Sequence, residues 1–380
     1  MLCNRTLSSG CSVSDYWMVA LHGLKLDLTM TAYFMLAPWL GLLPGIFFSK
    51  MNLRKILFPY YIIISLFTAI VFVVDTSLYR FWNFKLDVTV LFYLDSPSNA
   101  IASVSFPFIA FRILLTMLLS GLYLWLFLKI TPAAFLPVKN VKNKLAGTAA
   151  MLLAGLILFV FIRGGVSEST PNVGKVYFSK NQFLNHSAVN PAFSFLYSLG
   201  KSENFSEQFN FFPEKERQEI FEGLYPKGSE TSVRLLNTNR PNIVIVLLES
   251  FSGNFVEALG GEPNITPNFN RLSEEGIFFT QFYSNSFRTD RGIVCALSGY
   301  PGLPTTSVMK LPVKSQQLPS IAASLAEAGY KSDFLYGGDI DFTNMRSYFL
   351  SSGYQKIVSD EDFTLKERHT HAWGVNDDIT

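Results

Sequence analysis

Charged residues are scarce in this chain of 380 residues. Asp, Glu, Lys and Arg together make up 16% of it, whereas hydrophobic residues make up 49%. Soluble globular domains contain about 25% charged residues, so this composition argues against an ordinary soluble protein. The net charge is only +2, which excludes the strong positive charge that nucleic-acid-binding proteins use to hold phosphates. We therefore expect no nucleic acid among the partners of this chain.

Cysteine is rare as well, since the chain has only Cys3, Cys11 and Cys295. Three residues are too few for a disulfide framework, and their spacing matches no metal-binding pattern. Cys3 and Cys11 could pair outside the cell, but two ordinary thiols near a terminus are the simpler interpretation. Residues 1–26 also contain no recognisable signal peptide, because no basic start precedes an apolar run.

What the chain does contain is a set of long apolar runs. Each is close to the ~20 residues of helix that cross a bilayer. Buried helices of a soluble core are the alternative, but all the runs fall in one half of the chain. We therefore predict a membrane domain of about four helices over residues 30–163, after an N-terminal segment of residues 1–29. The predicted spans are Met30–Phe48, Ile56–Thr76, Phe106–Leu128 and Leu145–Ile162.

Positive charge in the loops predicts the orientation of these spans. The loops at 49–55 and 129–144 are rich in Lys and Arg, as cytoplasmic loops are, whereas residues 77–105 carry a balanced set. Everything after Arg163 then lies outside the cytoplasm, and four spans also require an external N-terminus. We predict a multi-pass protein of the bacterial cell (inner) membrane. Asp75 and Arg112 fall near the outer ends of their spans and are interpreted as interfacial anchors, with a contact to a lipid head group as the alternative.

Two further segments follow the predicted spans. Residues 164–240 contain too many Phe residues for a disordered tether, so we predict an ordered extracytoplasmic linker with one or two short helices, the clearest at Pro213–Phe221. Residues 241–380 alternate between strand-like and helix-like patterns, which indicates an α/β domain with a mainly parallel sheet. Strands are predicted at 242–248, 278–283, 333–336 and 355–358, and helices at 267–276, 321–328 and 343–353, with Thr266, Pro319 and Thr343 at their starts.

Glu249 and Thr289 stand out in the α/β segment. Glu249 follows the apolar run 242–248, at the carboxyl end of a predicted strand, where ligands bind in open α/β sheets. It could equally be the first solvated residue after a buried strand. Thr289 lies where a strand gives way to a helix, and free backbone N–H groups there favour anions. Arg288 and Arg291 flank it and could form a guanidinium fork for phosphate or sulfate, although Thr289 followed by Asp290 is also an ordinary helix start.

These residues carry a resemblance to a known family. Leu-Leu-Glu249-Ser250, Thr-Pro267-Asn-Phe, Phe-Arg-Thr289-Asp-Arg-Gly and Leu-Ser-Gly-Tyr-Pro301 resemble the lipoteichoic acid synthase branch of the alkaline phosphatase and sulfatase superfamily. Its members are membrane-anchored phosphoglycerol transferases. The resemblance implies that Glu249 is a metal ligand and that Thr289 is both nucleophile and metal ligand. It also implies a divalent metal, manganese or zinc, and substrate contacts from Arg291 and Arg346.

The implied reaction moves a phosphoglycerol group from a membrane phospholipid to a glycan or lipid acceptor through a covalent threonine intermediate. A phosphoethanolamine transferase or a sulfatase-like hydrolase is the alternative enzyme, although the Cys-x-Pro-x-Arg type of sequence of sulfatases proper is absent. A non-catalytic membrane partner or inactive fragment is the alternative of another class.

The resemblance is incomplete at the C-terminal side. The family completes its metal site with an aspartate and a histidine farther along, whereas Trp373-Gly374 resembles the middle of its catalytic domain. We therefore expect that only the N-terminal part of a sulfatase-like domain is present, that the chain is truncated, and that it has little or no activity alone. His369 and His371 could be proposed as ligands, but a His-x-His pair without further ligands is a weak metal signal.

Overall fold

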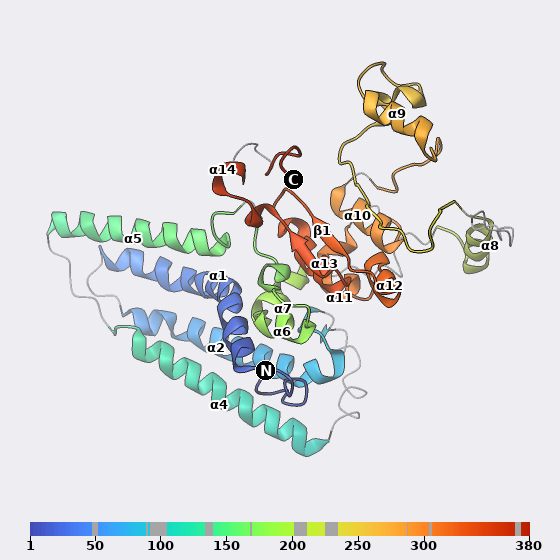
Figure 1. Cartoon of the computed structure of the whole chain (residues 1–380). Helices are drawn as coiled ribbons and strands as arrows, with labels where there is room; N and C mark the ends of the chain where they lie inside the picture. The colour runs from blue at the N-terminus through green and yellow to red at the C-terminus, as the bar shows by residue number, and fades with distance from the viewer. Residues whose placement is uncertain are drawn as a thin grey trace. The chain divides into compact units, whose positions relative to one another are not determined.

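The computed structural model divides the chain into two units. One comprises Met1–Ser202 and Asp290–Thr380, and the other comprises Glu203–Thr289. Each is described here by itself. The structure describes residues 1–47, 52–88, 90–91, 105–133, 140–167, 169–200, 211–224, 235–286, 288–303, 306–368 and 374–380 (Figure 1).

Four long helices make up the N-terminal part of the larger unit. They are α1 (Val13–Gly45), α2 (Leu53–Trp82), α4 (Phe106–Ile130) and α5 (Val141–Ile162). All four are long and apolar enough to cross a membrane, which confirms the number of helices predicted from the sequence. The first begins well before Met30, because the Ser12 hydroxyl accepts the N–H of Asp15 and the Asp15 carboxylate accepts the N–H of Ser12.

The long helices pack as neighbouring pairs. Contacts join α1 with α5, α2 with α4, and α1 with α2. The Trp39 indole N–H donates to the carbonyl of Met151 at 2.9 Å, which connects α1 to α5. The second pair is antiparallel, because Tyr61 in the first half of α2 stacks on Phe127 near the end of α4, with ring centroids 5.3 Å apart.

The linker after α5 is folded against α1 and α2. Its elements are a 3₁₀ turn η2 (Val173–Val176), α6 (Gln182–Ala188) and α7 (Pro191–Leu199). Asn172, Asn181 and Asn190 begin these elements, and each side chain accepts a backbone N–H of the first turn. In α1, a Cβ at Gly23 would lie 2.9 Å from the carbonyl oxygen of Ala188, so only glycine permits this close approach to α6.

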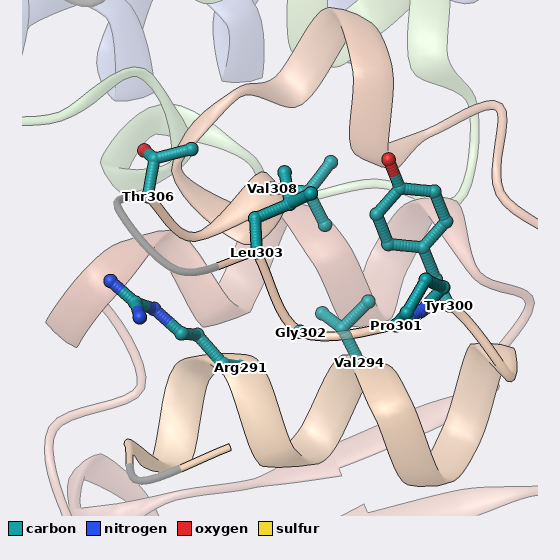
Figure 2. Close-up of a pocket in the computed structure, with 8 residues that line it drawn as sticks. All are labelled: Arg291, Val294, Tyr300, Pro301, Gly302, Leu303, Thr306 and Val308. Carbon is teal, nitrogen blue, oxygen red and sulfur yellow. The ribbon is translucent and has the colours of Figure 1, made fainter. Parts of the chain in front are cut away.

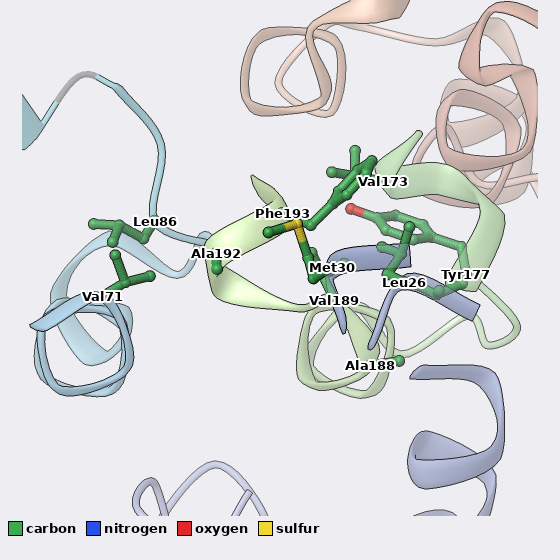
Figure 3. Close-up of a cluster of buried hydrophobic side chains, with 11 residues drawn as sticks. Leu26, Met30, Val71, Leu86, Val173, Tyr177, Ala188, Val189, Ala192 and Phe193 are labelled. Carbon is green, nitrogen blue, oxygen red and sulfur yellow. The ribbon is translucent and has the colours of Figure 1, made fainter. Parts of the chain in front are cut away.

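A hydrophobic cluster joins the linker to α1 and α2 (Figure 3). Leu26 and Met30 come from α1, and Phe193 comes from α7. The cluster therefore continues the apolar faces of the long helices into the linker. Its buried members are Leu26, Met30, Val71, Leu86, Val173, Val176, Tyr177, Ala188, Val189, Ala192 and Phe193.

The C-terminal part of the larger unit is a small α/β layer. Strands β1 (Asp333–Leu335) and β2 (Lys356–Val358) pair in parallel with Phe334 opposite Ile357, which confirms two predicted strands and their direction. The crossover between them carries α13 (Met345–Ser351), whose Phe349 stacks on Phe334. The remaining elements are α10 (Thr289–Ser298), η5 (Val308–Lys310), α11 (Pro312–Ser315), α12 (Ile321–Glu327), η6 (Phe342–Asn344), η7 (Asp360–Asp362) and α14 (Leu365–Arg368).

The smaller unit is built from short helices and loops. It contains α8 (Glu214–Leu224), two 3₁₀ turns at Gly253–Phe255 and Glu257–Leu259, and α9 (Pro267–Glu275). The acid-rich first turn of α8 agrees with the helix predicted after Pro213. A hydrogen bond of 3.1 Å from the Asn270 amide to the Glu257 carboxylate ties α9 to the preceding turn.

Two predicted strands were wrong. Residues 242–248 and 278–283 form no strand, and Val244 is 84% exposed. A single extended segment leaves its backbone N–H and C=O groups unpaired, and no described segment pairs with either run. The apolar composition of these two segments predicted buried strands. The described residues contain no neighbouring strand that could pair with either segment.

The predicted start of α9 is confirmed, because Thr266 precedes Pro267, although its hydroxyl donates to the carbonyl of Phe255 instead of accepting an N–H of α9. Two other predicted helix starts were wrong. Ser320, not Pro319, precedes α12 and accepts the N–H of Ala322. Thr343 and Asn344 have φ angles of 51° and 74°, and Asn344 precedes α13. A turn contact replaced the capping bond of Thr266, and positive φ angles at Thr343 and Asn344 delayed the start of α13.

We predict that the buried ion pair between Lys85 and Asp75 stabilises the larger unit. The ammonium lies 2.5 Å from the Asp75 carboxylate, which also accepts the N–H of Leu86, and both side chains are less than 10% exposed. Lys85→Met should lower the free energy of unfolding by about 3 kcal/mol, because it leaves a buried carboxylate unpaired. Thermal unfolding in detergent measures this change.

Two controls make that measurement specific. Lys180→Met removes a cation that is exposed and should leave the unfolding midpoint unchanged. The double variant Asp75→Leu with Lys85→Met removes both charges and should recover most of the lost stability. Equal stability of Lys85→Met and the parent chain would contradict a stabilising pair.

Candidate functional site

The structure brings Glu249 and Thr289 together. Glu249 lies in the turn that follows the exposed segment 242–248, and Ser250 beside it has a φ of 58°. Thr289 is the first residue of α10, and its hydroxyl donates a 2.6 Å hydrogen bond to the Glu249 carboxylate. Both residues belong to the smaller unit, and their side chains are accessible to a ligand. A hydroxyl that donates to an accessible carboxylate can be deprotonated or can share a cation with it.

Arg291 lines a small cavity in the larger unit (Figure 2). It projects from α10 with Val294, and Tyr300 to Leu303 come from the loop that follows. The volume is about 10 Å³, which is room for about one water molecule. The Arg291 side chain is buried, whereas Arg288 is exposed. A contact of Arg291 with a phosphate stays a prediction.

Arg346 is held by two carboxylates. Its guanidinium donates to Asp341 at 2.7 and 3.3 Å and to Glu361 at 3.1 Å. Burial by itself lowers the pKa of Arg346, but the hydrogen bonds and charges of Asp341 and Glu361 together raise it above the ordinary value. Asp341 is buried and makes two contacts, whereas Glu361 is 55% exposed. Asp341 therefore fixes the orientation of the arginine, and an anion that approaches from solvent meets Glu361 first.

The loop before α13 is joined to the linker by side-chain hydrogen bonds. The Asp339 carboxylate accepts the N–H of Ser169 at 2.9 Å, and the Asn344 amide oxygen accepts the N–H of Gly174 at 2.9 Å. The Asn172 amide donates to the carbonyl of Asp341 at 2.7 Å. The segment that carries Arg346 is thus part of the same packed body as the linker and α1.

Sequence reasoning missed these polar residues. The sequence singled out Thr343 at the start of this helix, and neither Asp341, Asn344 nor Asn172 belonged to a motif. One signal was available for Asn344, since Asn is the residue other than glycine that most readily adopts a positive φ. No local signal indicates that Asn172, about 170 residues away, contacts the same loop.

A buried lysine lies beside this loop. Lys175 donates to the Ser167 hydroxyl at 2.8 Å and to the carbonyl of Ser169 at 2.9 Å. Burial lowers its pKa, while the nearby charges of Asp341 and Asp339 oppose that change. The linker therefore places the amino group of Lys175 close to the charges of two loop carboxylates, Asp339 and Asp341.

Residues 241–380 match the sulfatase family. This match supports the alkaline phosphatase and sulfatase superfamily for the segment, and members of that superfamily are generally enzymes. A solved structure of a protein in the alkaline phosphatase superfamily from Vibrio parahaemolyticus is 39% identical over 34% of this chain, with a TM-score of 0.32. The match spans 31% of the length of that protein.

The sulfatase-type segment contains two neighbouring candidate metal ligands. Enzymes of the superfamily typically use divalent metals. Glu249 and Thr289 offer two neighbouring oxygen atoms, whereas zinc takes four ligands and harder divalent cations take about six. Within the described ranges, no group of three or more His, Cys, Asp or Glu side chains is placed to hold a metal ion. The described residues therefore do not complete a metal site, and His369 and His371 lie outside them.

A pH-dependent carboxylate lies beside β2. Burial, followed by the charge of Asp339, raises the pKa of Asp360 from about 3.8 to about 6, and Arg368 partly offsets this increase. Since the folded state holds the proton more tightly than the unfolded state, stability falls as the pH rises from about 4 to about 6. At neutral pH the folded protein contains an ionised Asp360 close to a second carboxylate.

We predict that Asp360→Asn stabilises the protein at pH 7.5. The expected gain is about 1 kcal/mol, since the site is partly exposed and solvent screens the repulsion. At pH 4, where Asp360 is protonated in the folded state, the variant and parent should unfold at the same temperature. Asp378→Asn, an exposed control, should change neither midpoint. An equal gain at both pH values would show that charge is not the cause.

Proposed function

We propose that this chain is a membrane-embedded transferase of the sulfatase type that moves a phosphoglycerol group through a covalent Thr289 intermediate. The observation that carries the proposal is the 2.6 Å hydrogen bond between the Thr289 hydroxyl and Glu249, inside the segment that matches the sulfatase family. Thr289 begins a helix of ten residues, where the dipole favours the negative charge of an attacking oxygen and of a phosphate.

The proposed reaction has two steps. The Thr289 oxygen attacks the phosphorus of a phospholipid such as phosphatidylglycerol, its proton passes to the Glu249 carboxylate, and the bond from phosphorus to the diacylglycerol oxygen breaks. Diacylglycerol leaves after it gains a proton. A hydroxyl of a glycan or lipid acceptor then attacks the phosphothreonine diester and releases Thr289. Two displacements replace one difficult reaction, which is the general advantage of a covalent intermediate.

The membrane location belongs to the same proposal. Four helices of suitable length and composition precede the linker. The loops at 49–55 and 129–144, which join α1 to α2 and α4 to α5, are rich in Lys and Arg, and this favours a cytoplasmic position for them. The linker and the sulfatase-type segment would then face the outside of a bacterial inner membrane. Anchoring of this kind keeps the reactive hydroxyl close to lipid head groups.

Substrate contacts from Arg291 and Arg346 are also proposals. Arg346 is the better placed, because Asp341 holds its guanidinium in one orientation near the surface. A divalent metal, manganese or zinc, would contact Glu249 and Thr289, but the described residues supply only this pair of ligands. For that reason no step above depends on the metal.

We predict a covalent adduct on Thr289. The purified chain is incubated with phosphatidylglycerol and Mn²⁺ or Zn²⁺, and the peptide that contains Thr289 is weighed by mass spectrometry. A glycerophosphoryl group on this peptide is the expected result. The first displacement alone forms this adduct, so the test does not require the second step or repeated turnover. Thr289→Ala should abolish the adduct, Thr289→Ser should retain it, and Glu249→Gln should reduce it by about a hundredfold or more.

The outcomes separate the candidate functions. An adduct formed from phosphatidylethanolamine but not from phosphatidylglycerol favours a phosphoethanolamine transferase. No adduct from either lipid, with both metals and a folded chain, favours a non-catalytic membrane partner. A modified residue other than Thr289 would contradict the proposed nucleophile.

We further predict that Asp341 positions Arg346 for the lipid head group. Asp341→Asn should weaken equilibrium binding of glycerol phosphate by roughly tenfold, because the guanidinium loses a bidentate partner. Glu361→Gln is the matched control, since it removes the exposed partner and keeps the buried one; binding should be equal or tighter. Calorimetric titration measures both variants without requiring turnover. Equal weakening by the two variants would contradict the distinct role of Asp341.

A further inference from the structure

Arg112 is a positive charge in the first part of α4. It belongs to the half-buried stripe of α4, whose positions recur every three to four residues from Phe108 and Arg112 to Leu124 and Leu128, and the last two pack against α2. Rings from its own helix flank the guanidinium, with Phe108 at 4.8 Å and Phe111 at 5.8 Å from the central carbon. These rings hold the group in place.

Among the described residues, no acceptor lies within hydrogen-bond distance of the Nε atom of Arg112. Within the described residues, the Arg112 side chain has no hydrogen bond and no carboxylate partner, and its Nε atom is buried. Two other cations of the larger unit do have acceptors. Arg54 donates to the carbonyl of Thr131 at 2.9 Å, and Lys85 is paired with Asp75. A guanidinium has five N–H donors, and in an apolar setting each requires an acceptor.

The depth of Arg112 can be estimated from helix geometry. A helix of 25 residues is about 37 Å long, whereas the hydrocarbon of a bilayer is about 30 Å thick, so a centred α4 extends about 4 Å beyond each side. Arg112 lies six residues after Phe106, or about 9 Å along the axis, which places its Cα about 5 Å inside the hydrocarbon. A long arginine side chain from this depth reaches the level of the lipid phosphates.

The side of the membrane follows from the packing. Since α2 and α4 are antiparallel, the start of α4 lies on the same side as the end of α2. Near that end, the Tyr79 hydroxyl is 3.0 Å from Nδ1 of His186 in the linker. Arg112 therefore lies on the side of the linker.

We propose that Arg112, on the half-buried stripe of α4, binds the phosphate of a glycerophospholipid in the leaflet next to the linker. The planar guanidinium matches a phosphodiester, and Phe108 and Phe111 offer apolar surface to the glycerol and upper acyl chains. A free phosphate would lack this apolar contact. The site rests on the proposed membrane embedding but not on the proposed transfer reaction, and it would hold a lipid close to the extracytoplasmic segment.

The test is native mass spectrometry of the detergent-purified chain titrated with dioleoylphosphatidylglycerol. Arg112→Gln should weaken binding of the first lipid by about tenfold, which corresponds to the loss of a charge-assisted hydrogen-bonding group. Dioleoylglycerol, which has the same chains without phosphate, should bind parent and variant equally. Inorganic phosphate should not displace the lipid from the parent chain.

Lys129→Gln is the matched control. Lys129 lies at the other end of α4, 4.8 Å above the Trp125 ring, so its replacement removes a similar cation from the opposite side. This variant should keep the first lipid with unchanged affinity. If Arg112→Gln does not fold, Arg112→Lys is measured in its place. This variant keeps the positive charge and loses the planar guanidinium, so several-fold weaker binding of the lipid is expected.

The outcomes distinguish this site from the wider proposal. Unchanged lipid affinity of a folded Arg112→Gln or Arg112→Lys variant overturns the phosphate site and leaves the transferase proposal intact. Equal weakening by Lys129→Gln also overturns it, because binding would then depend on charge at either end. A folded parent chain that binds no dioleoylphosphatidylglycerol also overturns the phosphate site.

Discussion

The linker segment that follows α5 is buried although it forms no strand, and this constraint shapes the larger unit. A buried backbone must find hydrogen-bond partners, and here side chains supply them. Asp339 and Asn344 accept N–H groups of the linker, and the Asn185 amide oxygen accepts those of Phe178 and Ser179, both at 2.9 Å. These bonds connect the long helices, the linker and the small α/β layer into one unit.

The same constraint explains the unusual backbone before α13. Thr343 and Asn344 adopt positive φ angles, which are costly for residues with a Cβ atom. The Asn344 side chain, in return, contacts both Gly174 and the carbonyl of Met309. A Cβ at Gly174 would lie 2.3 Å from the Asn344 oxygen, so the glycine and the asparagine depend on each other. The resulting turn directs Arg346 toward Asp341.

Charge placement along the chain shows a division of roles. Two buried cations of the larger unit are paired with carboxylates, Lys85 with Asp75 and Arg346 with Asp341, and an unpaired charge at either position would be strongly destabilising. Glu249 and Thr289 in the smaller unit are exposed, so the cost of burying a charge does not explain why they are hydrogen-bonded to each other. Accessible polar groups that meet over a separation of 40 residues are characteristic of sites that bind or react.

The sequence by itself determined the elements that depend on local composition. The long apolar helices, α9, α12 and the strands β1 and β2 all follow from periodicity, length and Gly or Pro punctuation, and the resemblance singled out Glu249 and Thr289. Only the tertiary structure decided which predicted strands formed, because a strand needs a partner and residues 242–248 have none among the described segments. It also decided the contacts of Asn172, Asp341 and Asn344, since hydrogen bonds between distant segments leave no local pattern.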